Sequence, residues 1–300
     1  MCRRPFARTP ARVFRDMGCR ILGWETSGHH WLHRYRRIYG AVPLKLSLVW
    51  DLMRSQHGNH GQTVKDLLWT FHWFKNYGTE ENTATTLGTT DKTLREHLWP
   101  TIELIESLDI INWEQRKVRA APWNQCRVSV DGTDFRILEQ WPFNKRWYSH
   151  KYEGPAVRYE LAISISTGWI VWVNGPFAAG EWPDLRIVGD VLNSGLEPGE
   201  YYIADGGYWD GYRYTITPTG YKFHSDRVRG LVRARHENIN RRFKQWGCLQ
   251  QKWRHSVEKH GLVFRAIANI IQIGLMTDEP AWDIHYDERE FGDRFLMQGA

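Results

Sequence analysis

Apolar and polar residues alternate in several short segments near the middle of the chain. Residues 128–131 read Val-Ser-Val-Asp, the period-two pattern of a half-buried β-strand. Residues 159–166 alternate in the same way, and a turn at Thr167 and Gly168 leads into the apolar run 169–173. The pattern predicts three strands with hairpin connections before the first helix of this region.

A further apolar run, at 201–204, ends in Asp205 and is followed by two glycines. The first strand likewise leads into Asp131, followed by Gly132. We therefore expect Asp131 at the exposed tip of its strand, with a sharp turn directly after it, and the same design at Asp205. The element order is typical of an α/β domain with a mixed sheet. In such a sheet the two carboxylates end on neighbouring strands at one edge.

Helical spacing of apolar residues marks other segments. Pro43 begins a predicted helix that ends in the loop 57–61, and Thr63 caps a second helix running to about Tyr77. The second helix is apolar over much of its circumference, so we expect it inside a small helical domain. We expect the last of the later helices to cover a face of the sheet. These later helices are predicted at 183–192, 233–246 and 256–276.

Residues 80–108 predict two helices joined by a tight turn at Gly88, which is the outline of a helix-turn-helix. Thr90 or Asp91 is the expected N-cap of the second helix, and Pro100 is expected to kink or interrupt it. A plain helical hairpin explains the pattern equally well. The side chains that the second helix could present to a major groove are Lys92, Arg95, Glu96 and His97.

Composition indicates a globular protein of one or two domains, with 300 residues, 42% hydrophobic and 25% charged. The formal net charge of +6 makes an acidic partner plausible. Residues 1–40 carry nine Arg against two acids, a net of 9 − 2 = +7, whereas residues 278–300 carry 2 − 7 = −5. We interpret 1–42 as a basic arm, with a disordered tail, a DNA-contacting or nuclear-import arm and a transit peptide all open.

Cysteine spacing and hydropathy exclude several classes of protein. The four cysteines stand apart in the sequence and form no C-x-x-C pair, so neither a zinc ribbon nor a disulfide framework is indicated. The chain has no uninterrupted apolar run of about eighteen residues, so no membrane span is expected.

Three acidic residues are the candidate metal ligands: Asp131, Asp205 and Glu237. Mg²⁺ and Mn²⁺ prefer oxygen ligands, and two such ions can activate the attacking oxygen and stabilise the leaving one during displacement at phosphorus. Singly, each acid has a plainer explanation, because Asp before Gly is common in turns and Glu in a helix is usually solvated. Glu237, however, lies among basic residues in a helical pattern, and two separate apolar runs end in Asp-Gly.

These segments resemble the nuclease domain of PIF/Harbinger-type DDE transposases. The matching motifs are VDGTDF with Asp131, ADGGY with Asp205, and RARHENINRRFKQWGCLQQKWRH with Glu237. The segment between the first two motifs is also similar, and Asp184 falls where the family often has an Asp. The resemblance covers about 126–276. Residues 80–108 resemble the helix-turn-helix that precedes that domain.

The resemblance implies an RNase H-like fold, two divalent ions, Mg²⁺ or Mn²⁺, and DNA cleavage followed by strand transfer. It also implies a nuclear location and a Myb-like partner protein that supplies much of the DNA recognition. Two positions depart from the family pattern. Asp134 stands where many members have His, and either bonds a local turn or adds a carboxylate near the site. Asn238 stands where the family commonly has Arg.

We therefore predict an α/β protein, in which an RNase H-like mixed sheet flanked by helices follows an all-α helix-turn-helix-like domain. Its substrates would be the terminal inverted repeats and target DNA. A homodimer is compatible with this prediction. Two alternatives stay open: a non-catalytic DNA-binding regulator derived from a transposase, and a repair or RNA-processing nuclease. The predicted segments are an arm (1–42), a helical domain (43–110), a linker (111–125), a nuclease domain (126–277) and an acidic tail (278–300). The predicted DNA contacts are Lys92, Arg95, Lys145, Lys151, Arg158 and Arg241. For Lys145, Lys151 and Arg158, solvated surface is the plainer explanation of each taken alone.

Overall fold

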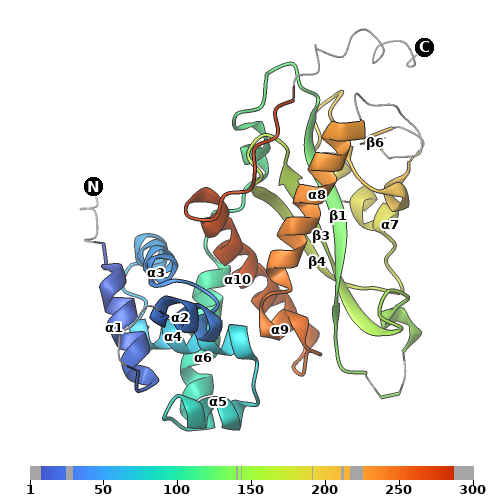
Figure 1. Cartoon of the computed structure of the whole chain (residues 1–300). Coiled ribbons are helices and arrows are strands. Elements are labelled where there is room, and N and C mark those ends of the chain that lie inside the picture. The colour runs from blue at the N-terminus through green and yellow to red at the C-terminus, as the bar shows by residue number, and fades with distance from the viewer. Residues whose placement is uncertain are drawn as a thin grey trace, which may run out of the picture. The chain divides into compact units, whose positions relative to one another are not determined.

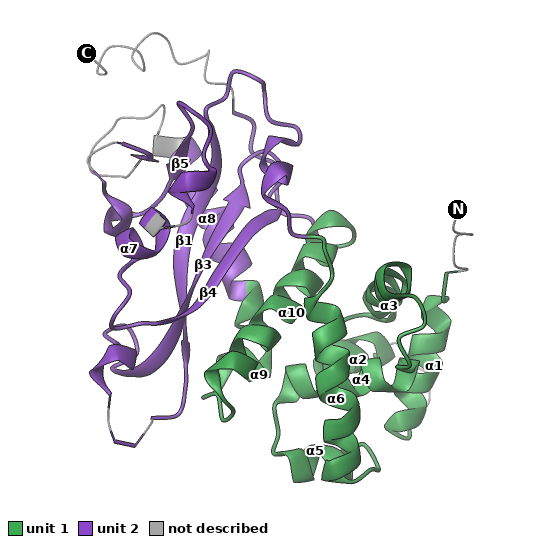
Figure 2. Ribbon diagram, turned by 180° about the vertical axis from the view of Figure 1, so that it is seen from behind, with its two compact units in different colours: residues 1–110, 242–278 green, residues 111–241, 279–300 purple. Residues whose placement is uncertain are grey.

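The chain folds into two units that are interleaved in the sequence (Figure 2). A helical unit takes residues 1–110 and 242–278, and a sheet unit takes residues 111–241 and 279–300. The first division agrees with the predicted end of the helical domain at residue 110. The predicted nuclease domain is too long at its other end, because 242–277 belongs with the helices. The computed structural model describes residues 8–24, 30–139, 141–142, 144–190, 192–210, 213–216 and 226–286.

The helical unit is built around α4 (Val64–Asn76) (Figure 1). Every residue of α4 from Asp66 to Phe74 is buried, as its apolar circumference predicts. Thr63 and Asp66 form a capping box, in which the Asp66 carboxylate accepts the Thr63 N–H at 2.7 Å. The other helices of this unit are α1 (Ala11–Ile21), α2 (Trp31–Tyr39), α3 (Pro43–His57), α5 (Glu80–Thr86), α6 (Asp91–Glu106), α9 (Gly247–Gln250) and α10 (Val257–Met276).

The prediction of a basic arm is wrong for the segment that forms α1 and α2. Both helices have buried apolar positions, among them Phe14, Tyr35 and Tyr39, each fully inaccessible to solvent. The arginines of this segment lie between those positions on the outer faces. The charge count therefore concealed two amphipathic helices that pack on the rest of the unit.

The turn between α5 and α6 contains Gly88 with φ of 65°, and the Thr90 hydroxyl caps α6 by accepting the Thr93 N–H at 3.2 Å. The interruption expected at Pro100 is absent, because α6 continues to Glu106. Four positions of α6 at helical spacing are fully buried, and this packing outweighs the lost backbone hydrogen bond. Those positions are Leu94, Leu98, Ile102 and Ile105.

The sheet unit is a mixed sheet with strand order β2-β3-β1-β5-β6, and β4 pairs with β3. β1 and β3 are antiparallel over nine residue pairs, from Val128–Ser164 to Arg136–Ala156, and β4 returns along β3. β5 joins β1 in parallel, so the predicted neighbours are confirmed. The strands are β1 (Cys126–Arg136), β2 (Tyr148–Ser149), β3 (Gly154–Ser164), β4 (Ile170–Ala178), β5 (Tyr201–Ile203) and β6 (Thr215–Ile216).

Two helices flank this sheet, α7 (Asp184–Asp190) and α8 (Asp226–Phe243). On one face Val128 and Val130 of β1 pack in a cluster with Val188 of α7. On the other face Cys126 packs in a cluster with Val232 of α8. A register shift between Cys126 and Val128 places these two β1 residues in different clusters.

The helix predicted to cover the sheet, α10, instead packs against α6 and α3. Asn269 of α10 donates to the carbonyl oxygens of Ile105 and Glu106, each at 2.9 Å. The apolar spacing of α10 was read correctly as helical, but the pattern alone could not say which partner it covers. In the sheet unit, α8 takes the position that we expected for α10.

Candidate active site

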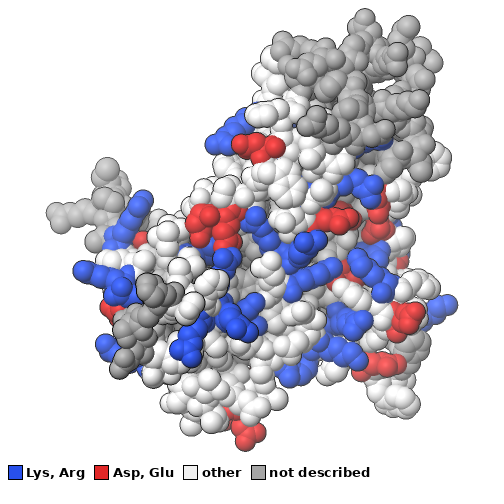
Figure 3. Space-filling model, in the orientation of Figure 1, with Lys and Arg blue, Asp and Glu red and all other residues white. Residues whose placement is uncertain are grey.

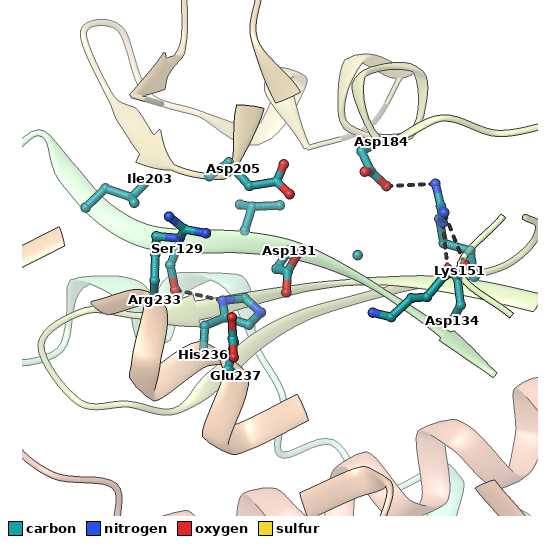
Figure 4. A pocket seen from close by; sticks show the side chains of 14 residues that line it. Ser129, Asp131, Asp134, Lys151, Asp184, Ile203, Asp205, Arg233, His236 and Glu237 are labelled. Atoms are coloured by element: carbon teal, nitrogen blue, oxygen red, sulfur yellow. Dashed lines mark hydrogen bonds and ion pairs between the residues drawn. The ribbon is translucent and has the colours of Figure 1, made fainter. Parts of the chain in front are cut away.

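Asp131, Asp205 and Glu237 all line one cavity of about 310 Å³ in the sheet unit (Figure 4). They come from β1, from the segment after β5 and from α8. Asp184, at the start of α7, lines the same cavity. The sequence-predicted trio therefore converges, together with a further carboxylate.

Asp131 lies in the middle of β1 and not at its tip, because β1 pairs with β3 as far as Arg136. The sharp turn predicted at Gly132 is therefore wrong. The parallel neighbour β5 pairs with β1 only as far as Ser129. Asp131 lies just beyond the last residue of β1 that pairs with β5, although β1 itself continues. Ligand sites in sheets with parallel strands commonly lie at this position.

Gly132 matters because it has no side chain. A Cβ atom at this position would lie 2.8 Å from Oδ1 of Asp184, which is closer than real Cβ contacts. The same atom would lie 3.5 Å from the hydroxyl of Tyr208. The glycine of the Asp-Gly pair therefore permits the close approach of Asp184 to β1, and does not form a turn.

Asp205 follows the end of β5 and is the N-cap of the short 3₁₀ helix η4 (Gly206–Tyr208). Its Oδ1 accepts the N–H of Gly207 at 2.9 Å. The strand-end arrangement predicted for Asp205 is thus present. The hydrogen bond fixes the carboxylate at the cavity while a second oxygen stays available to a ligand.

Glu237 is exposed on α8, and its neighbours on that helix anchor it against β1. His236 shares a hydrogen bond of 2.9 Å between its Nδ1 and the hydroxyl of Ser129. One turn further, Asn240 Nδ2 donates to Oδ2 of Asp131 at 2.9 Å. These two bonds flank Glu237 along the helix, so the sequence R-H-E-N-I-N carries both the acid and the groups that position it.

Burial, together with the negative charges of Asp205 and Asp184, raises the pKa of Asp131 to about 7. The positive charge of Lys151 and the backbone N–H of Gly132 oppose the rise. Burial also raises the pKa of Asp184, against the effect of Arg158. The cavity therefore holds more negative charge than its surroundings compensate, which is the condition under which a bound cation is most stabilising.

Arg158 links two acids beside the cavity and is therefore not a free phosphate contact. Its Nε and Nη2 donate to Asp134 at 2.7 and 3.2 Å, and its Nη1 donates to Asp184 at 3.0 Å and to the Trp182 carbonyl at 3.3 Å. These bonds use four of the five guanidinium donors. Asp134 is buried and also accepts from Ser149 at 2.7 Å, so it is a carboxylate beside the site and not a turn residue.

The other predicted DNA contacts are all exposed. Lys151 lines the cavity, and Lys145 and Arg241 lie on the sheet unit outside the cavity lining. Lys92 and Arg95 lie on α6, where Arg95 is held by ion pairs with Asp91 and with Glu80, the latter at 3.0 Å. Of the six, Lys151 is the cation best placed to meet a phosphate at the acids.

The cavity offers carboxylate oxygens, which are the ligands that hard divalent cations prefer. The ionised form of Asp131 is destabilised by its acidic neighbours, so a bound cation would stabilise it. Among the described residues, no three His, Cys, Asp or Glu side chains are close enough together to hold a single ion. Mg²⁺ commonly takes only one or two protein carboxylates and completes its shell with water and phosphate oxygens. The carboxylates therefore suit ions shared with a phosphate substrate.

Sequence reasoning missed Asn240, His236 and the bridging role of Arg158. Asn240 lies three residues after Glu237, which is the spacing of side chains on one helix face, and this signal could have identified it. The partnership of Arg158 with Asp134 could have been found from their cross-strand pairing, had the register been known.

Within the described ranges, no helix combines the length and the apolar character that crossing a membrane requires.

The chain was compared with protein-family models, with curated proteins and with solved structures, and none of the three comparisons finds a match.

Proposed function

We propose that the chain is a divalent-metal-dependent DNA nuclease of the transposase type, built on an RNase H-like sheet. The supporting observation is the half-buried Asp131, with Asp205 and Asp184 close enough to raise its pKa and Glu237 on the same cavity. Carboxylates gathered with only partial charge compensation are the donor set of metal-dependent phosphoryl chemistry. Strand transfer to target DNA, a nuclear location and a Myb-like partner rest on the family resemblance alone.

In this proposal Asp131, Asp205 and Glu237 would hold two Mg²⁺ or Mn²⁺ ions. Such ions, when bound, activate the attacking oxygen and stabilise the leaving oxygen at phosphorus. The protein's own groups prepare the site. Asn240 holds the Asp131 carboxylate in one orientation through its 2.9 Å hydrogen bond. Lys151 lines the cavity and places a positive charge where the substrate phosphate enters.

A second candidate is a DNA-binding regulator that keeps the fold without turnover. The observation that favours it is the lack, among the described residues, of three ligands in reach of one ion. The presence of Asp131 in a destabilising environment favours the nuclease, because a protein without turnover gains nothing from a half-buried carboxylate of raised pKa.

The test is cleavage of supercoiled plasmid by the full chain with Mn²⁺ or Mg²⁺, followed by joining of a labelled duplex with a free 3′ hydroxyl to the plasmid. We expect nicking by the parent and loss of at least about a hundredfold in Asp131→Asn and Glu237→Gln. Glu81→Gln, which removes an exposed acid of α5, is the matched control and should nick like the parent. Equal nicking by all four proteins would overturn the site assignment. Metal binding by the parent without nicking or joining would favour the regulator.

A further inference from the structure

Side chains of α2 join it to α1. The Tyr35 hydroxyl donates to the Phe14 carbonyl and the Tyr39 hydroxyl donates to the Gly18 carbonyl, each at 2.9 Å. A Cβ atom at Gly18 would lie 2.6 Å from the Tyr35 ring, so the absence of a side chain at Gly18 lets this ring pack against α1. Their relative position is thus fixed by two buried hydrogen bonds and one tight contact.

The outer surface of this pair is strongly basic. The described residues 8–24 and 30–40 hold seven arginines and one acid, Asp16, a net charge of 7 − 1 = +6. Asp16 is occupied by an ion pair with Arg15 at 2.8 Å. Figure 3 shows Lys and Arg side chains on the face of the molecule that carries α1 and α2. The exposed arginines of this segment are Arg8, Arg12, Arg20, Arg34, Arg36 and Arg37.

The predicted recognition helix has the opposite charge. Residues 80–106, which contain α5 and α6, hold two cations and six acids, a net charge of 2 − 6 = −4. Of the two cations, Arg95 is engaged by Asp91 and Glu80, which leaves Lys92. Phosphates would be repelled by this surface and attracted by α1 and α2, because nonspecific affinity for DNA depends on neutralised phosphate charges.

We propose that the outer face of α1 and α2, defined by Arg12, Arg20, Arg34, Arg36 and Arg37, is the surface on which the helical unit docks duplex DNA. The proposal takes its partner, DNA, from the proposed function. α1 has eleven residues and is therefore about 16 Å long, which spans about nine phosphate charges of a duplex. Arginines are the main exposed side chains of this face. Its exposed large apolar residues among those described are Val13, which is 36% exposed, and Leu32, which is 43% exposed. This composition fits a phosphate backbone better than an apolar partner.

The test measures binding of a labelled random-sequence duplex to the full chain in EDTA, across a series of salt concentrations. The variant Arg12→Gln/Arg20→Gln/Arg37→Gln removes three exposed cations, for none of which the described residues provide an ion pair. Each lost phosphate contact lowers the slope of log affinity against log salt by about one, so we expect a slope smaller by about 2 to 3 and at least tenfold weaker binding. Thermal unfolding of the variant should match the parent.

Lys92→Gln/Arg95→Gln is the control on α6, and we expect it to change the slope by less than one. A larger loss in this control than in the arginine variant would overturn the surface. So would unchanged binding by the arginine variant, or parent binding to phosphatidylserine vesicles that exceeds binding to the duplex. EDTA separates this outcome from catalysis. If the protein nicks plasmid but its DNA binding does not depend on these arginines, the proposed nuclease function stands and the docking surface is wrong. If DNA binding depends on the arginines but no nicking occurs, the docking surface stands and the nuclease function is wrong.

Discussion

Asp131→Asn should stabilise the metal-free protein although it removes the proposed catalytic acid. The folded protein keeps a proton on Asp131 up to a pKa of about 7, whereas the unfolded chain releases it near the ordinary value of 3.8. A raised folded pKa gives stability that is fully present below the unfolded pKa and is lost as pH rises through the folded pKa. The parent therefore loses stability from about pH 4 to about pH 7, and the Asn variant does not.

The size of the effect follows from the two pKa values. At about 1.4 kcal/mol per pH unit, ionising Asp131 in the folded protein costs up to about 4 kcal/mol above pH 7. Asparagine has nearly the same volume, and its side-chain oxygen can still accept the hydrogen bond from Asn240. Partial solvation of the carboxylate reduces the gain, so we expect roughly 1 to 4 kcal/mol, or about 2 to 4 °C in melting temperature per kcal/mol.

The assay is thermal and urea unfolding of parent and variant in EDTA at about pH 5 and about pH 8, where the stability gap should widen by roughly 2 kcal/mol. Mn²⁺ should raise the melting temperature of the parent and leave that of the variant nearly unchanged. Asp109→Asn, an exposed acid of the helical unit, is the control and should show no widening gap. A variant less stable than the parent at about pH 8, or a gap independent of pH, would refute the reasoning.

Two further predictions concern buried acids of the sheet unit. Arg158→Met should destabilise by about 3 to 5 kcal/mol in urea unfolding, because Asp134 would stay buried without its cation, and adding Asp134→Asn should recover part of the loss. Additivity of the two changes would contradict this explanation. Glu160→Gln should stabilise the protein by up to about 5 kcal/mol above pH 8, because burial raises the pKa of Glu160 to about 8 and the parent loses stability from about pH 4.5 upward. Equal stability of parent and variant at about pH 9 would contradict it.

Alternation and Asp-Gly spacing were sufficient to predict β1, β3 and β4, and to place Asp131 and Asp205 on neighbouring strands. These signals are local, because a strand carries its period and its turn residues in its own sequence. They failed at Gly132, where the glycine leaves room for the Asp184 side chain and does not form a turn. A close approach of distant segments leaves no local trace.

Amphipathic helices raise a different difficulty. The arginines of α1 and α2 dominate a charge count, although Tyr35 and Tyr39 of α2 have the i, i+4 spacing of a buried helix face. Pro100 shows the converse, since the buried stripe of α6 maintains a helix that local propensity would break. Tertiary packing decided both cases, and packing partners can be read only from the folded chain.

The interleaving of the two units affects the order in which the protein can fold during synthesis. The helical unit uses both the first 110 residues and residues 242–278, so the ribosome must deliver the whole intervening sheet before α10 can reach α6. Until then, the carbonyl oxygens at the end of α6 that accept from Asn269 lack that donor. Contacts over such sequence separations form slowly. The nascent helical segment therefore has an incomplete core while the sheet emerges, and α10 completes that core only near the end of synthesis.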